Sequence, residues 1–135
     1  MFRIGITRDF LSADGKLVFQ DIGLRLLDEA PVIEYAFFHE HRTPVTPDQL
    51  ANCEGVISLG PRFTRESFSN AERLVALGRF GVGYEMIDLE AATEADVAVF
   101  ITPEGVRRPV AECVLTFMLA LSKKMLIKDR LTRAG

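Results

Sequence analysis

The sequence is poor in the side chains that most often bind transition metals. Its 135 residues include two cysteines and two histidines. Cys53 and Cys113 fit no metal-ligand spacing, and we expect two reduced thiols in apolar helical surroundings, although sequence alone leaves a disulfide between them open. His39 and His41 also match no metal motif, so we expect them in a solvated loop. The sequence therefore predicts no metal site.

The chain also lacks a long hydrophobic run and a strong charge imbalance. Its longest uncharged apolar run, Cys113 to Ser122, is far shorter than the roughly 20 residues that span a bilayer. The N-terminus leads directly into a strand-like pattern, so no signal peptide is predicted. A formal net charge of −3 argues against nucleic acid or an anionic membrane as the main partner. We therefore expect a cytoplasmic protein that binds neither nucleic acid nor a membrane.

Short β-rich runs alternate with helical segments along a chain of ordinary one-domain length. Several of the β-rich runs are almost continuously apolar, as in strands covered on both faces. The five predicted strands are Arg3–Thr7, Ile33–Phe37, Gly55–Ser58, Leu74–Gly78 and Ala98–Ile101. This alternation predicts an α/β fold, a flavodoxin-like, doubly wound parallel sheet of five strands with helices on both faces.

Helices are predicted between the strands from residues that commonly cap helix N-termini: Asp21, Thr46, Thr64 and Asp88. The longest predicted helix, Pro109 to Arg133, is apolar on nearly every side in its first half, which is typical of a helix buried all round. One five-stranded sheet needs only one of those faces, so a second partner is expected. We place a domain boundary here, with residues 1–108 forming a binding domain and residues 109–135 a hinge helix.

The most informative segment is Gly78 to Asp88, which follows an apolar strand and ends at a helix cap. Ligands of open α/β sheets bind beyond the carboxyl ends of the strands, where glycines let the backbone approach an anion. A plain strand-to-helix turn is the alternative interpretation. The segment is not a dinucleotide fingerprint, because Met86 stands where G-x-G-x-x-G needs its third glycine and the turn follows the fourth strand.

Arg107 and Arg108 lead into the long helix, where two cations oppose the helix dipole. The misfit indicates an anionic ligand or a salt-bridge partner, with solvated arginines as the alternative.

From Gly55 through Arg133 the sequence resembles the N-terminal, substrate-binding domain of the D-isomer-specific 2-hydroxyacid dehydrogenases, the phosphoglycerate dehydrogenase group. The resemblance covers about the last 80 residues strongly and the first 50 by pattern alone. The matching segments, in the same order and spacing, are Gly55–Ser58, Gly78–Tyr84, Ile87–Ala92, Thr102-Pro103 and Val110–Glu112.

The resemblance implies roles for individual residues. Leu59, Gly60 and the backbone amides of Val82 and Gly83 would hold the carboxylate and hydroxyl end of the substrate. The nicotinamide of NAD or NADP would lie near Val82 and Val106. Arg107 or Arg108 is a candidate contact for a second anionic group. These assignments describe a domain that binds substrate.

The sequence departs from the family pattern at three places. Glu85-Met86 replaces a usual Asp-Asn, Ile101 replaces a frequent asparagine, and Ser58-Leu59 replaces an Arg-Ser pair of some members. Phosphoglycerate is therefore not implied as the substrate.

The resemblance implies hydride transfer between NAD(P)(H) and a D-2-hydroxy or 2-keto acid. In the family, the arginine, glutamate and histidine that this step needs come from beyond the hinge helix. We therefore expect a truncated, inactive chain that binds no cofactor, lacks its NAD-binding domain and forms a homodimer. The dimer contact is expected on the apolar helix face that contains Val114, Phe117, Met118 and Leu121.

The alternative function is a stand-alone flavodoxin-like binding or signalling module without catalysis. A phosphoacceptor domain needs paired acids after its first strand and an aspartate at the end of its third. This chain has Arg8-Asp9 and Ser58-Leu59-Gly60 at those places. A flavodoxin needs a hydroxyl-rich phosphate loop after the first strand, which Thr7–Leu11 does not provide.

Overall fold

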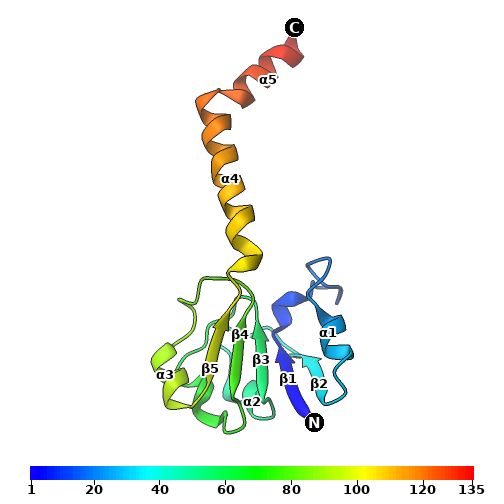
Figure 1. The fold of residues 1–135 in the computed structure, drawn as a ribbon, viewed down its shortest axis with the longest axis vertical. Coiled ribbons are helices and arrows are strands. Elements are labelled where there is room, and N and C mark those ends of the chain that lie inside the picture. The colour runs from blue at the N-terminus through cyan, green and yellow to red at the C-terminus, as the bar shows by residue number, and fades with distance from the viewer. The chain divides into compact units, whose positions relative to one another are not determined.

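Five parallel strands form the centre of the first of two structural units, Met1–Thr102, in a computed structural model that describes residues 1–135. The strands are β1 (Phe2–Ile6), β2 (Ile33–Phe37), β3 (Gly55–Ser58), β4 (Ala76–Arg79) and β5 (Ala98–Ile101). Their order across the sheet is β2-β1-β3-β4-β5, and all four neighbouring pairs are parallel (Figure 1). The predicted doubly wound α/β fold is confirmed.

The strand register separates two faces of the sheet, and one of them holds the main core. Leu77 of β4 pairs with Val56 of β3 and Val99 of β5, and Leu77 and Val56 are buried. Helical segments supply the opposing core residues: α2 (Pro47–Leu50), the 3-10 helix η2 (Ser67–Asn70) and α3 (Leu89–Glu94).

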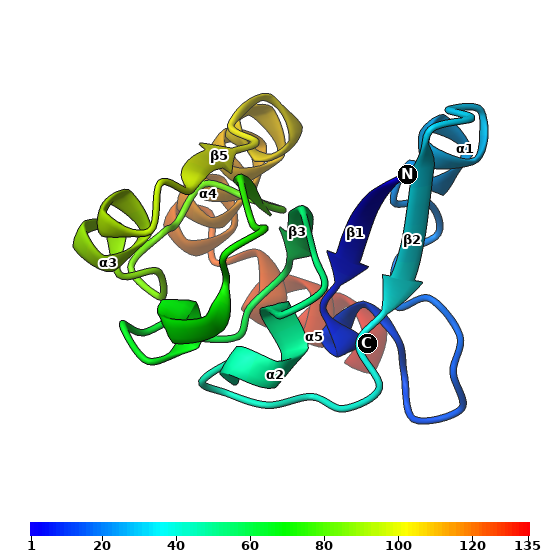
Figure 2. The same cartoon turned by 90° about the horizontal axis from the view of Figure 1, so that it is seen from below.

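The other face is covered beside β2 by α1 (Leu24–Asp28), where the Tyr35 hydroxyl donates to Asp28 Oδ1 at 2.9 Å. Figure 2 shows α1 and α2 on opposite sides of β1 and β2. A single layer on each side is what a doubly wound sheet requires.

Two of the predicted helix caps form as expected. Thr46 closes a capping box with Gln49, and Asp88 Oδ1 accepts from the Ala91 amide at 2.9 Å. Asp21 does not cap a helix in this way: its Oδ1 accepts a hydrogen bond from the Gly23 amide at 2.8 Å. Helix α1 begins only at Leu24, because Gly23 adopts a left-handed conformation.

Other predicted boundaries were also wrong. The strand predicted from Leu74 begins at Ala76, because the Leu74 amide bonds back to Ala71 O at 3.0 Å in a turn. Thr64 precedes a 3-10 helix that starts at Ser67, because the Ser67 amide and hydroxyl both bond to Thr64.

Both ends of the long predicted helix, which lies in the second unit, Pro103–Gly135, were wrong as well. Helix α4 (Glu104–Ser122) begins five residues before Pro109, since a proline near the first turns removes only one hydrogen bond. It also ends earlier than predicted, because Lys124 adopts a left-handed conformation with φ 54° before α5 (Met125–Ala134). None of the residues of α4 or α5 is buried within this unit.

Two further findings concern the membrane and the cysteines. No helix combines the length and hydropathy of a bilayer-spanning segment. Cys53 and Cys113 are both free thiols, so the disulfide that the sequence left open does not form.

Leu77→Ala should lower the free energy of unfolding by about 2–5 kcal/mol, because it leaves a cavity beside the central strands of a closed core. Val75→Ala, at a side chain that is 52% exposed one position before β4, should cost less than about 0.5 kcal/mol. Urea denaturation of both variants measures the difference. Equal losses would contradict the burial of Leu77 in the core.

Candidate functional site

The carboxyl ends of the parallel strands meet at one edge of the sheet, and the loops that follow them form the candidate site. The strand order reverses between β1 and β3, which is where open α/β sheets bind their ligands. Leu59 and Gly60 follow β3 directly, and Val82 and Gly83 follow β4 after a short turn. The structure thus brings these four predicted residues to one edge.

The turn after β4 is anchored to the strands on both sides of it. The Phe80 amide donates to Ser58 O of β3 at 2.8 Å. On the other side the Thr102 amide donates to Gly81 O at 2.8 Å, and the Gly81 amide donates to Thr102 Oγ1 at 2.7 Å. The turn therefore has a defined position relative to the sheet edge.

Arg79 holds the inside of the same turn. Its Nε donates to Gly83 O at 3.0 Å, and its Nη1 donates to Phe80 O. Gly81 has φ +145°, and a Cβ there would overlap the Arg79 guanidinium. The turn needs glycine at this position because the guanidinium occupies the space of a side chain.

The amides of Val82 and Gly83 donate to no acceptor in the protein. Because Arg79 binds carbonyl oxygens of the turn, the chemistry left for a ligand is N–H donation. Two neighbouring unpaired amides are a candidate site for a carboxylate or another anion.

The loop after β3 contributes one free amide. The Leu59 amide donates to Thr7 Oγ1 at 3.1 Å, and Thr7 is buried directly after β1. The Gly60 amide has no acceptor in the protein. Gly60 can therefore bind a ligand through its backbone, whereas the Leu59 amide is already occupied.

An aromatic cluster connects the loop after β1 to the turn after β4. Phe10, fully buried at the end of the 3-10 helix η1 (Arg8–Phe10), packs edge-to-face on Phe80 with ring centroids 5.3 Å apart. The ring of Phe19 lies 5.5 Å from that of Phe80. Sequence analysis missed the roles of Thr7, Phe10 and Arg79. The only available signal was that Thr7 follows β1 and Arg79 ends β4.

Val106, Arg107 and Arg108 lie in the first turns of α4, in the second unit. Arg107 Nη1 lies 3.3 Å from Glu104 Oε1, and Arg108 Nε donates to Glu112 Oε1 at 2.7 Å. These pairs on the same helix offset the unfavourable interaction of the arginines with the helix dipole. Salt-bridge partners, one of the three interpretations that the sequence left open, are therefore present, and both arginines are also exposed.

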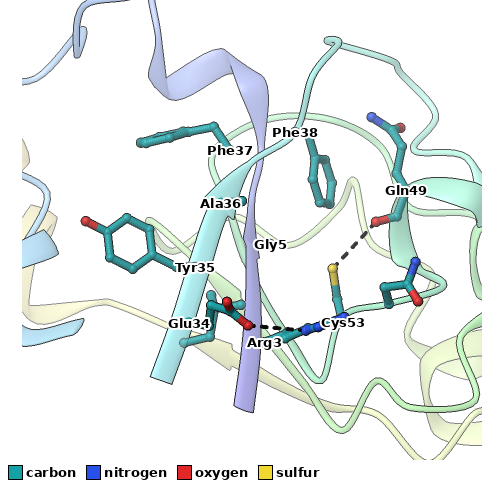
Figure 3. A pocket seen from close by; sticks show the side chains of 11 residues that line it. Arg3, Gly5, Glu34, Tyr35, Ala36, Phe37, Phe38, Gln49 and Cys53 are labelled. Carbon is teal, nitrogen blue, oxygen red and sulfur yellow. Dashed lines mark hydrogen bonds and ion pairs between the residues drawn. The ribbon is translucent and has the colours of Figure 1, made fainter. Parts of the chain in front are cut away.

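A hollow of about 360 Å³ lies beside β1, β2 and α2, apart from these loops (Figure 3). Cys53 lines it and lies 3.6 Å from Gln49 O, and burial raises the pKa of its thiol. A thiol with a raised pKa is a weak nucleophile at neutral pH. No group of three or more His, Cys, Asp and Glu side chains lies close enough to hold a metal ion.

The residues of this chain do not fit the pyrophosphate of a dinucleotide. The N-terminus of α3, the helix that follows the glycine turn, is capped by the Asp88 carboxylate, which occupies the Ala91 amide. A carboxylate at that position repels a phosphate.

Comparison with known proteins identifies the family. Residues 11–128 match the family described as D-isomer specific 2-hydroxyacid dehydrogenase, catalytic domain. The chain belongs to this family. The resemblance inferred from the glycine turn and its flanking segments is confirmed.

Two relatives illustrate the similarity within the family. The glyoxylate reductase of Thermococcus gammatolerans is 34% identical over 80 residues, which cover 59% of this chain and 24% of that protein. The D-3-phosphoglycerate dehydrogenase of Methanocaldococcus jannaschii is 39% identical over 70 residues, which cover 52% of this chain and 13% of that protein. The chain thus spans a quarter or less of these dehydrogenases.

Solved structures share the fold. A protein of Pyrococcus horikoshii OT3 matches all of this chain and 38% of its own, with a TM-score of 0.71 and 22% identity. The NAD+-bound 3-phosphoglycerate dehydrogenase of Entamoeba histolytica matches 88% of this chain and 38% of its own, with a TM-score of 0.66 and 20% identity.

Gly81→Ala should lower the free energy of unfolding by about 1–3 kcal/mol. The alanine would be held at an unfavourable φ, and its Cβ would displace the Arg79 guanidinium from the turn. Gly83→Ala is the matched control: its Cβ would meet only the mobile end of Glu85, 2.8 Å away, so the cost should stay below about 1 kcal/mol. Thermal denaturation compares the two. If Gly81→Ala lowered the free energy of unfolding less than Gly83→Ala, the described conformation of the turn would be wrong.

Proposed function

We propose that this chain is the substrate-binding part of an NAD(P)-dependent oxidoreductase acting on a D-2-hydroxy acid or the corresponding 2-keto acid. The observation that carries the proposal is the pair of unpaired amides at Val82 and Gly83, at the carboxyl end of β4. Membership of the 2-hydroxyacid dehydrogenase family supports it.

In this proposal the Val82 and Gly83 amides hold the substrate carboxylate, and Gly60 contributes a third donor from the loop after β3. Donors held by the backbone keep their direction when the ligand arrives, so they orient C2 without reorganisation. Glu85 must move first, because its carboxylate reaches over Gly83, but it is exposed and can rotate away.

The cofactor is proposed to be held mainly by another domain. Since Asp88 closes the helix N-terminus after the glycine turn, this chain supplies no phosphate site of its own. We propose only that Val82 and Val106 face the nicotinamide end of NAD or NADP.

We further propose that these 135 residues do not transfer hydride alone. Acid–base catalysis of this reaction needs a positioned group that exchanges a proton with the substrate oxygen. The two histidines, His39 and His41, follow β2, and the side chain of His39 is 98% exposed beside Glu40. An exposed side chain of this kind is not positioned for that role.

Contact of Arg107 or Arg108 with a second anionic group stays a prediction. Each arginine would have to release its glutamate, Glu104 or Glu112.

The cytoplasm is our proposed compartment. Both cysteines are free thiols, which suits a reducing environment.

We propose a homodimer as the assembly. Helix α4 carries apolar side chains that its own unit leaves exposed, among them Val114, Phe117, Met118 and Leu121. Such a face is covered by a partner in most soluble proteins, and in the proposal a second copy of α4 covers it.

Titration of the ¹⁵N-labelled chain with D-lactate should shift the amide resonances of Val82 and Gly83, with affinity in the millimolar range. D-lactamide has the same shape without the negative charge and should leave these resonances in place, because unpaired amides favour an anion. If D-lactate shifts neither amide at tens of millimolar, the proposed function is wrong.

Phe117→Asp should convert the dimer into a monomer in light scattering, because a buried unpaired charge opposes association. Thr116→Asp adds the same charge on the opposite side of α4 and should leave the dimer intact. If the wild-type chain stays monomeric at high concentration, the proposed homodimer is wrong.

A further inference from the structure

Asp9 has a buried oxygen without a partner. Its Oδ1 atom is inaccessible to solvent and receives no hydrogen bond. Buried polar atoms are almost always hydrogen-bonded, because an unpaired one loses its hydration without compensation. Neither the fold nor the amide site described above uses this carboxylate, so its position needs another explanation.

Asp9 lies at the edge of the sheet that carries the candidate site. It lies in η1 directly after β1, next to the reversal of strand order between β1 and β3. Its second oxygen, Oδ2, is 3.2 Å from the point that a Cβ on Gly60 would occupy. Asp9 therefore borders the loop whose free amide belongs to the candidate site.

The loop that carries Asp9 packs against the turn after β4. Phe10, the next residue, packs on Phe80 at the start of the glycine turn. The carboxylate and the amides of Val82 and Gly83 are thus carried by adjoining loops that contact each other, rather than by independent segments.

Arg8 and Arg79 do not pair with Asp9, because both guanidinium groups donate to backbone carbonyls. Arg8 Nη1 donates to Leu11 O at 3.0 Å and Ser12 O at 3.3 Å, within its own loop. Arg79 donates to the carbonyls of the glycine turn. The edge therefore combines free N–H donors with one acceptor that neither arginine neutralises.

We propose that Asp9 is a specificity-determining residue that selects the substrate at C3. With the substrate carboxylate on Val82 and Gly83, Asp9 accepts a hydrogen bond from a hydroxyl on C3 through Oδ2, the oxygen beside the Gly60 loop, while the buried Oδ1 stays inside the fold. The same charge repels a phosphate at that place. The preferred ligand class is a 2-hydroxy or 2-keto acid with an unmodified C3 hydroxyl. This inference rests on the proposed function.

Three D-2-hydroxy acids that differ only at C3 test it on the wild-type chain. D-glycerate carries a hydroxyl there, D-lactate a hydrogen and D-3-phosphoglycerate a phosphate. D-glycerate should bind about tenfold more tightly than D-lactate, the gain expected from a hydrogen bond to a charged acceptor. D-3-phosphoglycerate should bind most weakly, and only D-glycerate should strongly shift the Gly60 amide in ¹⁵N-edited spectra.

The variant Asp9→Asn keeps the size of the side chain and removes its charge. It should reduce the preference for D-glycerate over D-lactate to less than about threefold and strengthen binding of D-3-phosphoglycerate. Asp96→Asn is the matched control, because Asp96 is exposed in the turn before β5, at the opposite end of the strands, and asparagine tolerates its φ of 56°. It should leave all three affinities unchanged.

The outcomes separate the two proposals. If none of the acids shifts Val82 or Gly83, the proposed function fails. If all three bind there with equal affinity, or if Asp9→Asn has no more effect than Asp96→Asn, only the role of Asp9 fails. D-3-phosphoglycerate binding at least as well as D-glycerate would also overturn that role and would favour Arg107 and Arg108 as partners of its phosphate.

Discussion

The hydrogen bonds that join the turn after β4 to both neighbouring strands are the constraint on which the rest of the site depends. Phe80 is held to β3 through Ser58, and Gly81 is held to β5 through Thr102. Once these bonds form, the following amides have no acceptor within the fold. A strand-to-helix turn without these anchors could rotate its N–H groups toward its own carbonyls, and the edge would then lose its capacity to bind an anion.

Arg79 completes this constraint from the inside of the turn. Its guanidinium satisfies two carbonyl oxygens, so the backbone of the turn is left with unpaired donors and few unpaired acceptors. Gly81 is required because any side chain there would take the place of the guanidinium. An arginine close to a proposed carboxylate site would normally be assigned to the ligand. In this structure it instead binds the carbonyls of the turn and so positions the backbone amides proposed to bind the ligand.

The two units of the chain differ in the groups that they leave available for other molecules. The first unit carries the sheet, the core and every unpaired amide of the candidate site. The second consists of two helices without a buried residue, so its apolar side chains contribute to stability only through contact with something else. The match to the 2-hydroxyacid dehydrogenase family spans parts of both units, residues 11–128.

Local sequence was sufficient for the fold and the family. Apolar runs predicted all five strands, since a strand buried on both faces needs little beyond its own composition. Capping residues predicted the starts of α2 and α3, because a cap acts within three or four residues. The glycine turn and its flanking segments were sufficient to indicate the dehydrogenase family.

Only the tertiary structure decided which groups are left for a ligand. The Leu59 amide is occupied by Thr7, which is 52 positions away in the chain, and Gly81 is bound by Thr102, 21 positions away. No local pattern reveals such partners. The buried, unpaired oxygen of Asp9 likewise depends on the loops that pack around it. A backbone amide or a carboxylate is chemically the same wherever it occurs in a sequence, and its availability is settled by the segments that folding places beside it.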